Sequence, residues 1–491
     1  MNNLVGGGEI ARVFDQIQPG VIPNILANKY PSSAMRQIWS PEGKIIAERL
    51  LWVAVMEAQA EAGLTIPTEH IDDYRNVIGV INFDSMTQKE EITGHDVKAR
   101  IEEFDELAGH QDAHKALTSR DQTDNVEQLQ IMLSLKLIRA RMVAGISRLA
   151  VNAAQYALLP ITGRSHLQPA QTTTFGKRLA NHGEELMDAY WSMDDHIARY
   201  KLRGIKGPVG TQQDMLDLFD GDKEKVEALE AAIAQALGFT AVYNAVGQIY
   251  PRSRDNDSLH QLVHSIAPLS NFAKNTRLMA MLEQIRETTR SRVNSSAMPH
   301  KINPTLCERI NGFYTVVGGY QNMMREIGGD QWLEGTVADS VVRRVALDNA
   351  FFATDGAHET FLNIMDDFQI YPGAIDAELR RNLPFLSSTK LLMAAVKAGM
   401  GREDAHAIIK EHSSAAIEAV RLHGALDYDL YGRLARDPAF PLDAAQIEAA
   451  LDEPINLVGS APEQVAKFVR QAEEIISTDP EAAAYKPKRA L

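Results

Sequence analysis

The chain has 491 residues, of which 45% are hydrophobic, so it can build more than one domain around a large core. A formal net charge of −15 argues against general affinity for nucleic acids or anionic membranes, so an anionic ligand would need a local basic cluster. Cys307 is the single cysteine, which excludes an intrachain disulfide, argues against a cysteine-based metal site and fits a reducing compartment.

The N-terminal region predicts a cytoplasmic protein. Residues 1–21 include three consecutive glycines and no periodic apolar pattern, which indicates a flexible extension. They lack the basic-then-apolar layout of a signal peptide. The most apolar run, residues 50–56, is far too short to span a bilayer. We expect neither a membrane nor a nucleic acid as a partner.

Residues 22–124 are expected to form an N-terminal helical domain. Ser40-Pro41-Glu42 places a capping residue, a first-turn proline and an acidic first turn before a segment rich in Ala, Glu and Leu. This arrangement predicts a helix that extends through residues 44–62. A partner helix is expected between residues 84 and 104.

Residues 125–375 are expected to form a central bundle of very long helices. Apolar residues recur there at steps of three and four, and helices of this length are typical of a bundle or an oligomer core. No alternating strand pattern of comparable strength is present, so the predicted fold class is all-α with three helical domains. The third domain covers 376–491 and is expected to end in a loose tail. The first apolar stripe consists of Ile131, Leu135, Ile138, Met142, Ile146 and Leu149.

Two patterns could indicate a metal or a nucleotide but are better explained otherwise. His110 and His114 are spaced to share a helix face, yet no Glu-rich third ligand or HExxH pattern accompanies them. We therefore interpret them as ordinary histidines on a helix surface. The glycine-rich segment 204–211 lacks the Gly-Lys-Ser/Thr ending of a phosphate loop. The sequence predicts no metal and no cofactor.

The densest cluster of reactive side chains lies at residues 294–304, with the sequence Asn-Ser-Ser-Ala-Met-Pro-His-Lys-Ile-Asn-Pro. Asn303 is a favoured N-cap and Pro304 suits a first helical position, so a helix is expected from there towards Gly328-Gly329. The segment would then lie beside Lys301 at the positive end of a helix dipole, where an anion binds favourably. On composition alone, a polar surface loop is the simpler interpretation.

This stretch resembles the signature loop of the aspartase/fumarase superfamily, whose members cleave C–N or C–O bonds by β-elimination and release fumarate. His300, followed by Glu308-Arg309, makes it most similar to the adenylosuccinate lyase family. Other segments carry the same resemblance, which covers roughly residues 22–413. They are His95-Asp96, Thr118-Ser-x-Asp121, Gly163-Arg-Ser-His-x-x-Pro-Ala-Gln171 and Asp339-Ser-Val-Val-Arg-Arg344.

The resemblance implies an enzyme that releases fumarate from adenylosuccinate to give AMP, and from succinylaminoimidazole carboxamide ribotide in purine biosynthesis. Such an elimination needs a base, a group that stabilises the dianionic aci-carboxylate, and an acid for the departing nitrogen. We assign Ser295 as the base, with its alkoxide stabilised by Lys301 and backbone amides, and His166 as the acid. Glu308 would orient His166, and His95 would lie close to the substrate.

The resemblance also implies the binding residues and the assembly. The family forms a homotetramer in which segments of three subunits build each active site. Fumarate carboxylates would be held by Thr118, Ser119, Lys301 and Asn303, and the nucleotide by the arginine-rich helix after residue 338. The expected substrate-binding set is Lys29, Tyr30, Asp96, Thr118, Ser119, Gln248, Ser296, Asn303, Arg309, Ser340, Arg343 and Arg344.

Three positions depart from the family pattern, since Lys29, Gly94 and Gly335 stand where other members carry arginine. Losing a guanidinium fork costs roughly 1.5–3 kcal/mol if nothing replaces it. The candidate replacements are Lys98, Arg100 and Arg343. Two alternatives remain open, namely a sister lyase that acts on argininosuccinate or carboxymuconate, and a non-catalytic scaffold of the same fold.

Overall fold

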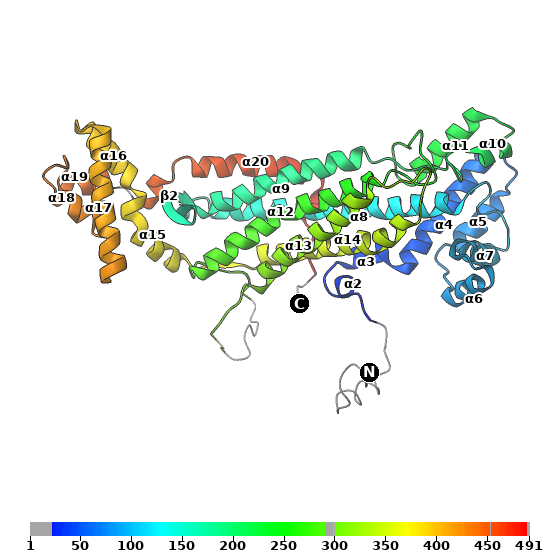
Figure 1. Cartoon of the computed structure of the whole chain (residues 1–491), viewed down its shortest axis with the longest axis horizontal. Helices are drawn as coiled ribbons and strands as arrows, with labels where there is room; N and C mark the ends of the chain where they lie inside the picture. The colour runs from blue at the N-terminus through cyan, green and yellow to red at the C-terminus, as the bar shows by residue number, and fades with distance from the viewer. Residues whose placement is uncertain (1–21, 290–297, 299, 426, 452, 489–491) are drawn as a thin grey trace, which may run out of the picture.

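The computed structural model describes residues 22–289, 298, 300–425, 427–451 and 453–488. The subunit is elongated, and long helices run along its length between a compact unit at each end (Figure 1). The described residues contain only two two-stranded sheets, so the all-α prediction is confirmed. No helix among them is both long and apolar enough to cross a membrane.

Five long helices form the central bundle: α8 (Ser119–Gln155), α9 (Phe175–Ala198), α12 (Ser253–Met281), α13 (Thr305–Ile327) and α14 (Ala338–Met365). The predicted stripe of α8 is buried in the shared core, where Ile131, Leu135 and Ile138 have no exposed surface. Each fully buried aliphatic side chain contributes about 1.5–3 kcal/mol, which explains why the period of three and four residues predicted this helix correctly. Thr118 and Asp121 start α8 with a capping box.

The start of α13 differs from the prediction by one residue and in its cap. Pro304 has φ −79° and ψ 62°, so it is the residue before the helix rather than its first residue, and its neighbour Asn303 is not the cap. The carboxylate of Glu287 accepts the backbone N–H groups of Leu306 and Cys307, both at 2.9 Å. The buried carboxylate of the residue that follows β3 (Ile285–Arg286) thus occupies the positive end of the dipole.

The N-terminal unit packs around its own core, in which Trp52, Tyr74 and Phe104 are fully buried. The predicted helices at 44–62 and within 84–104 are confirmed, although the second prediction covers two helices separated by Gly94. Helix α11 lies against α4. The helices of this region are α2 (Ile25–Lys29), α3 (Ser33–Trp39), α4 (Pro41–Glu61), α5 (Thr68–Asn76), α6 (Phe83–Thr93), α7 (Asp96–Ala108), α10 (Gln213–Leu218) and α11 (Lys223–Ala236).

His110 and His114 do not lie on a helix surface, so that interpretation was wrong. Both follow α7, which ends at Gly109 in the left-handed conformation with φ 79°. The ring of His110 stacks on His70 with centroids 3.6 Å apart. The His114 Nδ1 atom accepts a hydrogen bond from Trp52 at 3.1 Å.

The C-terminal segment divides between a small unit and the bundle. Residues such as Leu391, Leu430 and Leu434 form a separate small core, whereas α20 returns along α8 and α9 (Figure 1). A Cβ atom at Gly183 would lie 2.1 Å from the Phe468 ring, so only glycine permits this approach of α9 and α20. The elements are α15 (Pro372–Leu386), α16 (Ser388–Lys397), α17 (Arg402–His423), α18 (Leu430–Arg436), α19 (Ala444–Ala450), η1 (Pro454–Leu457), α20 (Ala461–Thr478) and α21 (Pro480–Ala483).

Two short antiparallel ribbons complete the fold. Strands β1 (Pro160–Ser165) and β2 (Gln168–Thr174) form a hairpin where the sequence indicated only a turn. Its two loop residues, His166 and Leu167, have φ values of 51° and 61°, which suits the twist of a two-residue hairpin. Strand β3 (Ile285–Arg286) pairs with β4 (Gln369–Ile370).

Candidate active site

The predicted site residues lie in three places along the subunit. The N-terminal unit and the adjoining end of the bundle carry one group, helix α2 and the first turns of α13 carry a second, and the hairpin carries His166 towards the opposite end (Figure 1). Ser295 and Ser296 lie outside the described residues.

The second group brings together residues far apart in the sequence. The Arg309 guanidinium lies 5.4 Å from the centre of the Tyr30 ring, and the Lys29 ammonium lies 5.7 Å from the same centre. Tyr30 packs edge-on against Phe313, and a Cβ atom at Gly356 would lie 2.8 Å from the Tyr30 Cβ. Helix α14 therefore needs glycine at residue 356 for Tyr30 to take this place. Two cations flank one aromatic ring here, which suits an anionic ligand.

The start of α8 meets the start of α14 in the first group. Thr118 and Ser119 lie at the N-terminus of α8, and the next residue, Arg120, donates a hydrogen bond from Nη2 to the Ser340 Oγ at 3.4 Å. The other end of its guanidinium lies 3.2 Å from Asp124. Sequence reasoning selected Thr118, Ser119 and Ser340 but missed Arg120. Its position inside the Thr-Ser-x-Asp segment was the available signal.

Gln248 and Gly335 are direct neighbours in this group. The Gln248 backbone N–H donates to the Glu334 carbonyl at 2.8 Å. A Cβ atom at Gly335 would lie 3.4 Å from the Gln248 side-chain oxygen, an ordinary van der Waals contact, so a side chain at this position would lie directly beside that amide. The missing arginine at this position therefore leaves room beside Gln248.

His95 is the N-cap of α7, and its ring is fixed by backbone hydrogen bonding. Its Nδ1 atom accepts the Val97 N–H at 3.2 Å, which leaves Nε2 to carry the proton of the neutral ring. Burial would raise the pKa of the adjacent Asp96 carboxyl, but Arg100 beside it lowers that pKa below its ordinary value. Gly94, with φ 67°, ends α6 in the left-handed conformation, where an arginine would be strained.

The two neighbouring arginines of α14 have opposite environments. Arg343 is buried, and its guanidinium lies 2.8 Å from Asp255 and 2.6 Å from Glu127. Its predicted roles, as a substrate contact and as a replacement for a missing arginine, do not fit a side chain whose charge is already neutralised inside the subunit. Arg344 is exposed and forms no ion pair with the described residues. Of the other proposed replacements, Arg100 pairs with buried Glu48 at 2.7 Å, whereas Lys98 is exposed.

The proposed acid on the hairpin and its proposed partner on α13 do not meet within the chain. His166 is exposed at the hairpin tip. Glu308 lies on the first turn of α13, 3.8 Å from Arg277, and no described hydrogen bond or ion pair joins it to His166. Lys301 is exposed and Asn303 half-buried just before α13. Within the described residues, no group of three or more His, Cys, Asp or Glu side chains could hold a metal ion.

Solved structures with this architecture define the class of the fold. A 3-carboxy-cis,cis-muconate lactonizing enzyme from Pseudomonas putida superposes with a TM-score of 0.79 and 20% identity, over 92% of this chain and 100% of that one. A fumarate lyase from Mesorhizobium sp. BNC1 gives 0.76 and 20%, with the same coverage. The subunit thus has the fold of the aspartase/fumarase superfamily.

Sequence comparison narrows the class to one family. The Lyase family model matches residues 29–319, and the model named Adenylosuccinate lyase C-terminus matches residues 384–468. The chain is 34% identical to adenylosuccinate lyase of Saccharomyces cerevisiae over 91% of this chain and 93% of that protein. It is 31% identical to the Schistosoma mansoni enzyme over 95% and 97%. The chain belongs to the adenylosuccinate lyase family, and its activity is that of a lyase.

Proposed function

We propose that this chain cleaves adenylosuccinate to AMP and fumarate by β-elimination, and cleaves succinylaminoimidazole carboxamide ribotide in the same way. The observation that carries this proposal is the relation to adenylosuccinate lyases over 91% of the chain, with the residues assigned to the chemistry all present. The cytoplasm is the proposed compartment, in keeping with the single cysteine.

The proposed mechanism moves two protons. Ser295 removes the proton from the carbon next to a carboxylate of the succinyl group, and the electrons collect on that carboxylate as a dianion. Lys301 stabilises the dianion electrostatically. The C–N bond then breaks, and His166 gives a proton to the departing nitrogen, which leaves fumarate and the free amino group of the nucleotide.

Each active site is proposed to combine three subunits of a homotetramer. The distance along the chain between the hairpin tip and the residues around α7 and the start of α8 supports this, as does the separation of His166 from Glu308. The bundle helices also expose large apolar side chains, which in a soluble assembly are suited to contact between subunits. These side chains are Trp191, Val316, Met323, Val341 and Val345.

The nucleotide phosphate is proposed to bind cations other than the arginines that are missing. Arg120, Arg309 and Arg344 each present a guanidinium near a predicted binding residue or at the surface of α14. Lys29 provides a point charge where a fork is usual, which preserves attraction but weakens geometric selection. A phosphorylated substrate therefore remains the best fit despite Gly94 and Gly335.

The direct test follows the ultraviolet absorbance of adenylosuccinate and identifies AMP and fumarate among the products. Ser295→Ala is expected to lower kcat by at least about 100-fold, because the general base is lost, while nucleotide binding is retained. Ser291→Ala, which changes a serine of the same segment outside the signature loop, is the matched control. Cleavage of argininosuccinate or carboxymuconate instead would favour a sister lyase, and a tetramer without any turnover would favour a scaffold.

A further inference from the structure

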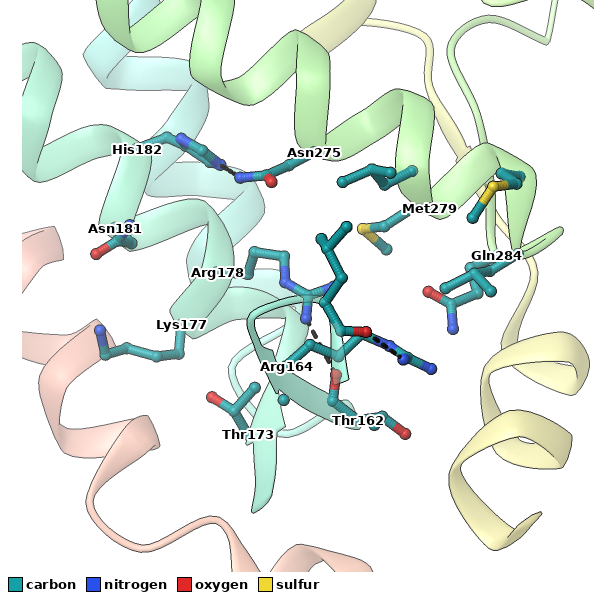
Figure 2. Close-up of a pocket in the computed structure, with 15 residues that line it drawn as sticks. Thr162, Arg164, Thr173, Lys177, Arg178, Asn181, His182, Asn275, Met279 and Gln284 are labelled. Atoms are coloured by element: carbon teal, nitrogen blue, oxygen red, sulfur yellow. Dashed lines mark hydrogen bonds between the residues drawn. The ribbon is translucent and has the colours of Figure 1, made fainter. Parts of the chain in front are cut away.

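A cavity of about 400 Å³ lies under the hairpin, between it, α9 and the end of α12 (Figure 2). Small-molecule sites usually measure about 300–1,000 Å³, so this space can hold a metabolite. None of its lining residues belongs to the proposed active site. We call it the hairpin cavity, and its polar lining includes Thr162, Arg164, Lys177, Arg178, His182 and Asn275.

The hairpin cavity has more positive than negative charge around it. Arg164 pairs with Glu378, but among the described residues the Arg178 guanidinium donates only to the neutral Thr162 carbonyl, at 3.1 Å. Lys177 forms no ion pair with the described residues. Burial and the neighbouring Arg164 lower the pKa of Arg178 to about 10, as expected for a cation without a full counter-charge. In a chain of net charge −15, such a local surplus calls for an explanation.

Two buried polar atoms of the lining also lack partners. The His182 Nε2 atom accepts from the Asn275 amide at 3.1 Å, so the neutral ring carries its proton on Nδ1. That Nδ1 and the Thr162 Oγ1 have no hydrogen-bond partner among the described residues, although His182 is only 4% exposed. Leaving a buried donor unsatisfied is costly, and a bound ligand would remove that cost.

The opposite wall of the hairpin cavity is apolar. It is formed by Leu278 and Met279 of α12 and by Leu282, the residue that follows this helix. Leu167 of the hairpin also lines the cavity. Met281, which is 72% exposed, lies at the mouth. A bare inorganic ion would leave this wall exposed to water, so the lining favours a ligand with an apolar or planar body.

We propose that the hairpin cavity binds a small organic anion, with a phosphate or carboxylate head near Arg178 and Lys177 and an apolar body against α12. Because β1 and β2 form one wall and carry His166 at their tip, the bound ligand would tie the hairpin to α9 and α12. Its effect on turnover rests on the proposed function, whereas binding itself does not.

The test uses calorimetric titration of the full chain without substrate. Phenyl phosphate supplies both halves of the ligand, inorganic phosphate only the head, benzyl alcohol only the body, and benzoate separates a carboxylate from a phosphate. Phenyl phosphate or benzoate is expected to bind at least about tenfold more tightly than either half alone, in line with one further satisfied contact. Equal affinity for inorganic phosphate and for the better aromatic anion would overturn the proposal.

Variants decide where the probe binds. Lys177→Gln, a change at the helix surface, and Arg178→Lys, which keeps the charge but removes the fork, are each expected to weaken binding about three- to tenfold. Lys467→Gln on α20 is the matched control. Binding that is lost in Arg344→Ala but unchanged in Lys177→Gln would place the probe in the active site and reject the hairpin cavity. Saturating probe is then added to the turnover assay of both proteins. A change of kcat in the parent that does not occur in Lys177→Gln would show that a ligand in the hairpin cavity affects catalysis through the hairpin that carries His166.

Discussion

Arg343 and Arg344 show how neighbouring residues acquire different tasks. Successive side chains on a helix point about 100° apart, so one arginine enters the interior and the other faces outward. The buried Arg343 pairs with Asp255 and Glu127. Burial alone would lower the pKa of its guanidinium, but these two acids raise that pKa above the ordinary arginine value. The sequence predicted a helix that carries both arginines. It could not predict which of them forms buried ion pairs, because the paired acids lie on α12 and α8, far away in the sequence.

Arg120 should matter for substrate affinity. Arg120→Met removes a guanidinium that contacts Ser340, so we expect KM for adenylosuccinate to rise about tenfold, with a smaller effect on kcat. Arg120→Lys should recover part of the loss, because the charge remains without the fork. Steady-state kinetics would check this, with Arg199→Met, a surface change on α9, as control. An unchanged KM in Arg120→Met would exclude this residue from the site.

His196 should make stability depend on pH in a defined window. It is buried on α9, its Nε2 lies 3.1 Å from the Ser258 hydroxyl, and burial lowers its pKa from 6.5 to about 4. The unfolded chain therefore takes up a proton that the folded chain does not, and this stability is lost as pH falls from about 6.5 to about 4. The loss is on the order of 3 kcal/mol.

His196→Gln removes this titration. It should be less stable than the parent at pH 7.5, and its disadvantage in thermal midpoint should shrink or reverse by pH 4.5. Differential scanning calorimetry across that range would measure both proteins. A gap that stays constant with pH would show that the pKa of His196 does not change on folding.

The elements differ in how far the sequence predicts them. The period of α8, α9 and α12 predicted long buried helices, and turn residues predicted a break at 162–176, because both signals are local. The loose tail was a wrong prediction. The Tyr485 hydroxyl donates to Glu359 at 2.7 Å, the Lys488 N–H donates to the same carboxylate at 2.6 Å, and Arg141 lies 3.3 Å from the centre of the Tyr485 ring. The alanine- and lysine-rich composition of the tail gave no sign of this contact, because its partner, Glu359, is a buried acid on the distant helix α14.

The same contrast applies to the candidate site. Resemblance gave the catalytic residue types in their segments. In contrast, no local sequence pattern predicted that Glu287, the residue after β3, accepts the first N–H groups of α13. Burying that carboxylate against two backbone N–H groups fixes where α13 starts, and thereby where Glu308 lies on its first turn. Contacts of this long range depend on the tertiary fold rather than on neighbouring residues.

The tail contact predicts a measurable loss of stability. Tyr485→Phe keeps the ring beside Arg141 but removes a hydrogen bond to a charged acceptor, which costs about 1.5–3 kcal/mol. We expect a lower thermal midpoint with little change in kcat. Tyr428→Phe, whose hydroxyl makes no hydrogen bond to the described residues, is the control. Equal midpoints for the two variants would mean that the tail does not secure the bundle.

At the scale of the whole molecule, the proposed catalytic residues lie far apart along one chain. His166 is exposed at one end, His95 and Thr118 belong to the other, and Glu308 pairs with Arg277 instead of a histidine. An antiparallel arrangement of copies would bring opposite ends together, as closed symmetric oligomers do with complementary surfaces. In the proposed homotetramer, each active site would therefore combine residues from different copies of the chain.

Mixing two inactive variants tests this sharing. If Ser295 and His166 of one site come from different subunits, random exchange of Ser295→Ala with His166→Ala protein leaves half the loops and half the hairpins intact. Half of a half, about one quarter of the sites, then has both groups, so about a quarter of the parental activity should return. Ser295→Ala mixed with Lys301→Met is the matched control, because both changes lie in one loop and every site keeps a defect. Rescue in the first mixture alone would establish that hairpin and loop come from different subunits, whereas no rescue after confirmed exchange would place both in one subunit and require the hairpin to move towards α13.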